Sequence, residues 1–210
     1  MKHTSLAIAA ATLLAGAGTA FAQTAQQNFV GPAIGLTVSS VQNKVDYEST
    51  IASINGQSTQ VNDTEASLIA SYGFAMSQNW VGTFGIAYSV KSSDAGSVNY
   101  TAGTAQSFSG KFKDHLALSF APGYRVGANT LVYGKLAYHQ LKSEFTDTAS
   151  SGGSNTHSGT GIGFGVAFAV TPKVELRTEY EVVNYSSEKT QLTTGKPEIS
   201  GLTLGLLYKF

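Results

Sequence analysis

"GIGFGVAFAV", residues 161–170, alternates large apolar residues with glycine and alanine. Successive side chains of a β-strand point to opposite faces. One face of this strand therefore carries five apolar side chains: Ile162, Phe164, Val166, Phe168 and Val170. The other face carries nothing larger than a methyl group. The stretch predicts a strand between one apolar environment and one in which there is little room.

The bare face indicates which environment lies inside. Glycine within a strand lowers stability and suits an open, solvated face poorly, whereas small residues fit a crowded interior. An eight-stranded barrel has an interior just wide enough to be filled by side chains. We therefore expect the apolar face of residues 161–170 to contact lipid and the glycines to face a narrow polar lumen.

The composition supports a surface with little charge. Only 12% of the residues are charged, about half the roughly 25% of an average soluble protein. The 13 basic and 13 acidic residues balance, which gives no electrostatic reason to expect a nucleic-acid partner. Cysteine is absent, so disulfides, thiolate metal sites, a cysteine nucleophile and a lipid-carrying cysteine are excluded. We expect no cofactor and no metal.

The first residues predict export. Met1-Lys2-His3 precedes the apolar run "LAIAAATLLAGAG", which is followed by small residues and then by polar ones. This order is typical of a secretory signal. We expect residues 1–22 to be a signal peptide and residues 23–210 a single barrel domain, with the cleavage pattern formed by Ala20, Ala22 and Gln23.

Apolar alternation along the rest of the chain predicts an all-β, eight-stranded antiparallel up-and-down transmembrane barrel. The expected strands are 29–41, 63–76, 80–91, 112–125, 131–143, 159–170, 174–186 and 198–210. The connections alternate between tight turns at 77–79, 126–130 and 171–173 and long polar segments at 42–62, 92–111, 144–158 and 187–197. In an antiparallel meander this puts short periplasmic turns at one end and long extracellular loops at the other. Pro122 lacks a ladder donor and is expected to mark a bulge.

Charged residues share the parity of the predicted lumen. They are Glu65, Arg125, Lys135, Glu175, Arg177, Glu179 and Glu181, with His115 and His139 at the same parity of their strands. Charges removed from bulk water must be paired, so a structural network of ion pairs is one interpretation. A narrow conductance path that opens when the pairs rearrange is the other. Arg125 and Lys135 are the expected cationic partners of the acids around Arg177.

The chain end carries a further alternating pattern. In "LTLGLLYKF" the residues Leu202, Leu204, Leu206, Tyr208 and Phe210 share one face. This end, with "LRTEYEVVNY" and "NFVGPAIGLTVS" earlier in the chain, resembles the small outer-membrane barrel family that includes the transmembrane domain of OmpA, the opacity adhesins and their "porin family" relatives.

The resemblance implies a location and a set of partners. Members of the family end in an aromatic residue that the outer-membrane barrel assembly machinery reads. It also implies residence in the outer membrane, with membrane lipid, lipopolysaccharide and periplasmic chaperones as partners. An extracellular partner of the loops is a further expectation, and its identity stays open.

Four functions are compatible with this sequence. The first is a non-enzymatic role in envelope integrity and surface contact through the external loops, because loops on a rigid scaffold carry recognition. The second is a small passive pore. The third is a barrel enzyme acting on lipid or peptide, for which the adjacent pair His157 and Ser158 offers weak geometry. The fourth is a soluble periplasmic carrier with the apolar face inside.

Overall fold

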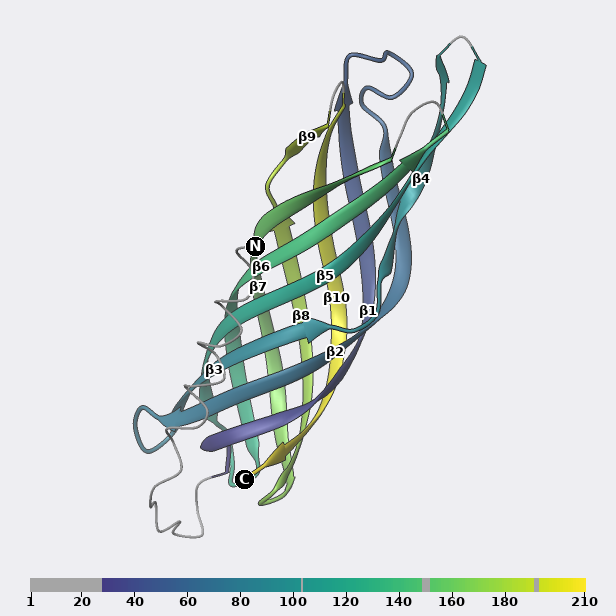
Figure 1. Ribbon diagram of the computed structural model, residues 1–210. Helices are drawn as coiled ribbons and strands as arrows, with labels where there is room; N and C mark the ends of the chain where they lie inside the picture. The colour runs from purple at the N-terminus through teal and green to yellow at the C-terminus, as the bar shows by residue number, and fades with distance from the viewer. Residues whose placement is uncertain (1–27, 103, 149–151, 191–192) are drawn as a thin grey trace, which may run out of the picture.

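The computed structural model describes residues 28–102, 104–148, 152–190 and 193–210, and these form a single elongated barrel (Figure 1). The strands are β1 (Gly31–Ser49), β2 (Ser58–Ala75), β3 (Trp80–Ser89), β4 (Ser93–Ala102), β5 (Thr104–Arg125), β6 (Thr130–Asp147), β7 (Gly153–Thr171), β8 (Val174–Tyr185), β9 (Glu188–Thr190) and β10 (Thr193–Lys209). The predicted signal peptide and its cleavage residues Ala20, Ala22 and Gln23 lie outside the described residues.

Eight of these strands form a closed antiparallel ring, as the sequence predicts. The order is β1-β2-β3-β5-β6-β7-β8-β10, and pairing of β10 with β1 closes it. β4 adds to the edge of β5 and β9 to that of β10. The short turns gather at the end of the barrel where the C-terminus lies (Figure 1). No described helix is both long and apolar enough to cross a membrane.

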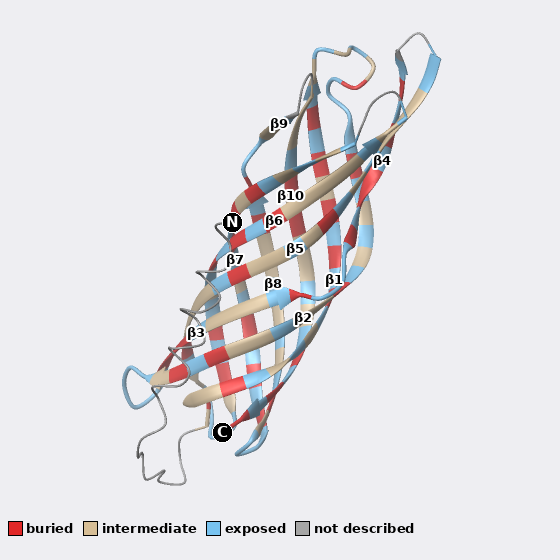
Figure 2. Ribbon diagram, in the orientation of Figure 1, coloured by how far each residue is buried: buried red, intermediate tan, exposed pale blue. Residues whose placement is uncertain are grey.

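The apolar side chains of β7 point outward. Ile162 and Phe164 are 65% and 67% exposed, whereas Ala167 and Ala169 opposite them in parity are buried. Figure 2 shows the same alternation of buried and exposed residues along the other strands. The alternative with the apolar face lining the interior is therefore wrong for this part of the barrel.

The long polar segments are mostly strand rather than loop, which corrects the prediction. β1 pairs with β2 as far as Asp46 and Ser58, and β4 and β5 form a hairpin across the segment expected to be a loop. Backbone donors and acceptors of adjacent strands continue to pair beyond the apolar band, so the polar composition did not exclude a sheet.

The outward-facing residues change from apolar to polar where these longer strands leave the apolar band. On β7 the outward residues below the change are Ile162 to Val170, and those above it are Ser154, Thr156, Ser158 and Thr160. β1 changes similarly, from apolar residues at Ile34 to Val38 to polar ones from Ser40 to Glu48. We call the part of the ring beyond Ser40 and Thr160, together with β4 and β9, the extension. Its outer surface suits water, and the band below it suits lipid.

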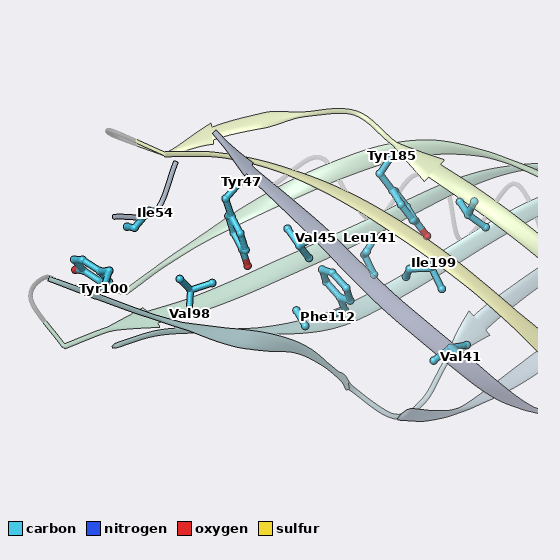
Figure 3. Packing of buried hydrophobic residues seen from close by; sticks show 12 residues of the cluster. Val41, Val45, Tyr47, Ile54, Val98, Tyr100, Phe112, Leu141, Tyr185 and Ile199 are labelled. Carbon is cyan, nitrogen blue, oxygen red and sulfur yellow. The ribbon is translucent and has the colours of Figure 1, made fainter. Parts of the chain in front are cut away.

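The interior changes in the opposite sense. Inside the extension a buried apolar cluster includes Val45, Tyr47, Phe112 and Leu141. These side chains come from β1, β5 and β6 and lie around one space (Figure 3). The barrel therefore has a polar interior within the lipid band and an apolar interior in the extension.

A bulge in β5 contributes to this arrangement. The register with β6 shifts between Lys113 and Leu116, and Asp114 has a left-handed φ of 48°. The extra residue reverses the parity of β5, which turns Phe112 inward. The bulge predicted at Pro122 is wrong, because the register on either side of Pro122 is unchanged. A proline removes one donor without displacing the strand.

Candidate functional site: the lumen charge network

The register of three strands brings the charged side chains of the lumen together. Gly163 of β7 pairs with Lys135 of β6 on one side and with Glu181 of β8 on the other. Gly165 pairs in the same way with Tyr133 and Glu179. Long side chains from β6 and β8 can therefore meet across β7, since the inner face of β7 has no side chains in the way.

Lys135 is the centre of the network. Its Nζ atom donates to Glu179 Oε1 at 2.8 Å and to Glu181 Oε2 at 3.0 Å. Tyr133 Oη donates to the other oxygen of Glu179 at 2.8 Å. Their side chains are no more than 15% exposed where the ion pairs form, so one ammonium group compensates two carboxylates in a place where water screens them little.

A second ion pair lies nearer the short-turn end. Arg177 Nε donates to Glu175 Oε1, and Arg177 Nη2 lies 3.4 Å from Ser71 Oγ. The side chain of Glu175 is 2% exposed. Since an unpaired carboxylate at such burial would be unfavourable, the pair is a structural requirement of a filled lumen.

Two histidines extend the network toward the extension. Glu65 accepts from His115 Nδ1 at 3.1 Å, His115 Nε2 lies 2.9 Å from His139 Nδ1, and His139 Nε2 lies 3.1 Å from Glu181 Oε1. Tyr185 Oη contacts His115 Nε2 at 3.0 Å. When both carboxylates are ionised they can only accept hydrogen bonds. Tautomers with the proton on His115 Nδ1 and on His139 Nε2 therefore fit the two ends of this chain of contacts.

Arg125 is not brought into this network. Its guanidinium donates to the main-chain carbonyls of Gln78 and Asn28, at 3.0 and 3.1 Å. Phe29 follows Asn28 and is buried against Val81 and Leu131 inside the short-turn end. Arg125 thus holds the segment that closes this end of the lumen, and the expected role as partner of the acids on β8 is not what the geometry shows.

Sequence reasoning missed Tyr133, Tyr185 and Phe29. Tyr133 and Tyr185 have the inward parity of β6 and β8, the same parity as Lys135 and Glu181, and this was the available signal. Phe29 has a left-handed φ of 72°, which strand alternation cannot predict.

The remaining spaces around the network are small. One cavity of about 90 Å³ lies beside His115 and Lys135, and another of about 30 Å³ lies beside Arg177 and Tyr133. A water molecule occupies roughly 30 Å³ in the liquid, so these cavities have room for only a few waters and form no wide path. Among the described residues, no group of three or more His, Asp or Glu could hold a metal ion.

His157 and Ser158, the adjacent pair weighed for the enzyme alternative, do not contact each other through their side chains. His157 Nε2 lies 2.9 Å from Ser143 Oγ, and His157 Nδ1 lies 3.1 Å from the carbonyl oxygen of Ser186. Ser158 Oγ accepts from Tyr138 Oη on the outer surface. The neighbours in sequence lie on opposite faces of β7, because adjacent strand residues alternate.

A glycine on the inner face of β7 gives a first prediction. A Cβ atom at Gly161 would lie 2.5 Å from Glu181 Oε1 and 2.8 Å from His139 Nε2. Gly161→Val should therefore lower the free energy of unfolding by about 1–3 kcal/mol, as overpacking usually does. Gly134→Val is the matched control, since nothing lies within 4 Å of its added Cβ. Urea titration of both variants in lipid vesicles measures the difference, and equal stabilities would contradict the packing described here.

A closed antiparallel ring with an apolar outer band and a polar, filled lumen defines a small transmembrane β-barrel of the outer-membrane type. The family model described as "Outer membrane protein beta-barrel domain" matches residues 8–210, and the chain belongs to this family. This confirms the resemblance found in the sequence. No curated protein sequence matches the chain significantly.

Solved structures share the fold. Neisserial surface protein A is 14% identical, covers 88% of this chain and 100% of its own, and has a TM-score of 0.52. Ail, the attachment invasion locus protein of Yersinia pestis, crystallised with the heparin analogue sucrose octasulfate, is 16% identical with coverages of 86% and 100% and a TM-score of 0.50. The outer membrane protease OmpT of Escherichia coli is 10% identical, with coverages of 90% and 99% and a TM-score of 0.50. At these identities the likeness is one of fold alone.

Proposed function

We propose that this protein is a closed, non-enzymatic outer-membrane barrel whose extension makes contacts outside the cell. The observation that carries the proposal is the combination of a filled lumen with strands that continue beyond the apolar band. In barrels of this class the short turns face the periplasm, so the extension projects outward, above membrane lipid and lipopolysaccharide. Its function is then that of a rigid scaffold for surface contacts and for envelope integrity.

The outer surface of the extension suits polar partners. Outward residues of β1 and β10 include Lys44, Asp46, Lys196 and Glu198, which mix both signs of charge. The structural neighbour Ail is an attachment invasion locus protein that was crystallised with a heparin analogue, a sulfated sugar. Exchange of these four residues for serine should reduce adherence of cells that display the protein to surfaces coated with host matrix, with display level measured by surface antibody. Equal adherence at equal display would remove this surface from the proposal.

Conductance separates the proposal from the pore alternative. Three features block the lumen: Phe29 at the short-turn end, the Lys135 ion pairs in the middle, and the apolar cluster of the extension. Purified protein in planar lipid bilayers should therefore show little current, or small intermittent steps, beside a 16-stranded porin as the positive control. Large and stable channels would reject the closed barrel in favour of a passive pore.

The non-enzymatic assignment is supported by the engagement of the described histidines. His115 and His139 belong to the charge network, and His157 contacts Ser143 and Ser186. An activated nucleophile needs a base that is available to it and a space for the reacting group. Incubation of the purified barrel with peptide and lipid substrates should release no product, and turnover that His157→Ala abolishes would overturn the assignment.

The chain end is proposed as the signal for assembly. Leu202, Leu204, Leu206, Tyr208 and Phe210 are exposed on the lipid face, and the family's final aromatic residue is read by the barrel assembly machinery, to which periplasmic chaperones deliver the chain. Deletion of Phe210 should slow insertion without affecting export. Lys209→Ser, on the opposite parity, is the control. Pulse-chase labelling scored by the heat-modifiable form measures the rate, and an unchanged rate would limit Phe210 to anchoring at the interface.

Residues 1–22 are proposed as a cleaved signal peptide that precedes the barrel domain at 23–210. The support is the order of charged, apolar and small residues at the start of the sequence. The intact mass of protein purified from the membrane should correspond to a chain beginning at Gln23. A mass that retains Met1 would reject cleavage.

A further inference from the structure

The interior of the extension contains a partly open space that the side chains of the described residues do not fill. A cavity of about 250 Å³ is lined by apolar residues that include Val45, Tyr47, Ile54 and Phe112. It is larger than the cavities of about 90 and 30 Å³ in the lumen below it. Protein interiors have few voids larger than a water molecule, so a space of this size in an apolar core suggests an occupant. We call it the chamber.

The wall of the chamber is aromatic. The ring of Phe108 lies between those of Tyr47, at 5.9 Å and nearly perpendicular, and Phe145, at 5.3 Å and stacked. Aromatic rings favour offset-stacked or edge-to-face neighbours at these separations. An apolar cavity of roughly 150 Å³ is enough to bind benzene. The chamber therefore has room for an aromatic molecule with one ring or with two fused rings.

The polar groups at the wall disfavour an anion. Asp147 and Glu188 line the chamber, whereas the carboxylate of Glu144 pairs with Lys113 and Lys142 on the outer surface. Tyr100 Oη donates to Asp147 at 2.8 Å, and Ser186 Oγ donates to Glu188 at 3.2 Å. A negatively charged ligand would meet carboxylates and lose its own hydration.

We propose that the chamber binds a small, uncharged aromatic molecule of one or two rings. This function goes beyond surface contact, because it uses the inside of the extension and leaves its outer surface free. The loop between β1 and β2 contributes Ile51 and Ile54 to the wall. The ligand therefore sits among β1, β5, β6 and this loop, above the charge network.

Two glycines provide a matched pair of variants. A Cβ atom at Gly195 would lie 3.6 Å from Val45 Cγ1 and 3.9 Å from Tyr47 Cε1, which is ordinary van der Waals contact. Gly195 lines the chamber, so Gly195→Leu places a side chain in the chamber without displacing the backbone. Gly134 lies on the lipid face with nothing within 4 Å of an added Cβ. Gly134→Leu is therefore the same substitution outside the chamber.

Equilibrium dialysis with 2-naphthol, a neutral two-ring probe, tests the proposal on the full barrel in lipid nanodiscs, with empty nanodiscs correcting for uptake by lipid. The wild type and Gly134→Leu should bind saturably, one probe per chain. Gly195→Leu, and the anionic probe 2-naphthoate on the wild type, should each bind at least about tenfold more weakly, a difference of roughly 1.4 kcal/mol.

A second measurement keeps the test decisive if Gly195→Leu does not reach the heat-modifiable folded form. Intermolecular nuclear Overhauser effects from 2-naphthol to the ring protons of Tyr47 and Phe108 should appear in the wild type. The proposal is overturned by uptake that does not saturate, by unchanged affinity in folded Gly195→Leu, or by contacts confined to lipid-facing residues.

Discussion

Lys135→Met should lower the free energy of unfolding by about 3–5 kcal/mol, the range observed when one partner of a buried ion pair is removed. Methionine keeps much of the side-chain volume and removes the charge. Glu179 and Glu181 then lose the ammonium group that lies 2.8 and 3.0 Å from them. Equilibrium unfolding by urea in lipid vesicles, followed by the heat-modifiable form on gels, measures the loss.

Two further variants identify the source of the effect. Lys44→Met removes a lysine whose partner Asp46 lies on the water-exposed outer surface of the extension, and it should leave stability nearly unchanged because exposed pairs contribute little. The double variant Lys135→Met with Glu181→Gln should recover part of the loss, since one of the two carboxylates is then neutral. If Lys135→Met unfolds at the wild-type urea concentration, the lumen is hydrated and the network is not a structural plug.

Phe164→Arg should destabilise the barrel by about 2–4 kcal/mol, as arginine does near the midplane of a bilayer. Phe164 is 67% exposed in the middle of the apolar stretch of β7 and packs beside Tyr180 with ring centroids 6.0 Å apart. The substitution moves a guanidinium into hydrocarbon and removes an aromatic contact. Folding titrations in vesicles of defined thickness give the difference.

The control is an arginine substitution at another outward-facing position, one in the extension and therefore outside the lipid. Gln42 is an outward residue of β1 in the extension, and Gln42→Arg should change stability by less than about 0.5 kcal/mol, as surface substitutions usually do. If the two arginine variants were equally tolerated, the apolar band would not be the lipid contact. If Gln42→Arg were the more damaging, the lipid would lie at the extension.

The sequence predicts the fold correctly where apolar residues alternate with small or charged residues and the apolar face contacts lipid. On β7 the contrast between Phe164 and Gly163 is large, and both faces were assigned correctly. On β8 the charges Glu175 to Glu181 repeat at every second residue. Such patterns report parity directly, whereas closure of the ring is shown by the pairing of β10 with β1.

The extension could not be recognised from the same rule. In β1 beyond Ser40 the apolar residues Val41, Val45 and Tyr47 are inside, whereas in the lipid band apolar residues are outside. Apolar and polar residues continue to alternate along the strand, but in the extension the apolar residues face the interior and the polar residues face outward. A polar composition therefore looked like a loop, and the chamber within it was missed. The bulge near Asp114 could not be predicted for another reason. The residue with the left-handed φ is an aspartate, so no glycine marks the position in the sequence.

Site-directed spin labelling along β7 tests the orientation of the barrel most directly. The chain has no cysteine, so single cysteines can be introduced from Ser154 to Val170 and labelled one at a time in lipid vesicles. Collisions with oxygen, which concentrates in lipid, should be frequent at Ile162, Phe164, Val166, Phe168 and Val170 and rare at the residues between them. At Ser154, Thr156 and Ser158, collisions with a water-soluble relaxation agent should be more frequent than collisions with oxygen. Oxygen maxima at Gly161, Gly163 and Gly165 instead would show that the apolar face lines the interior.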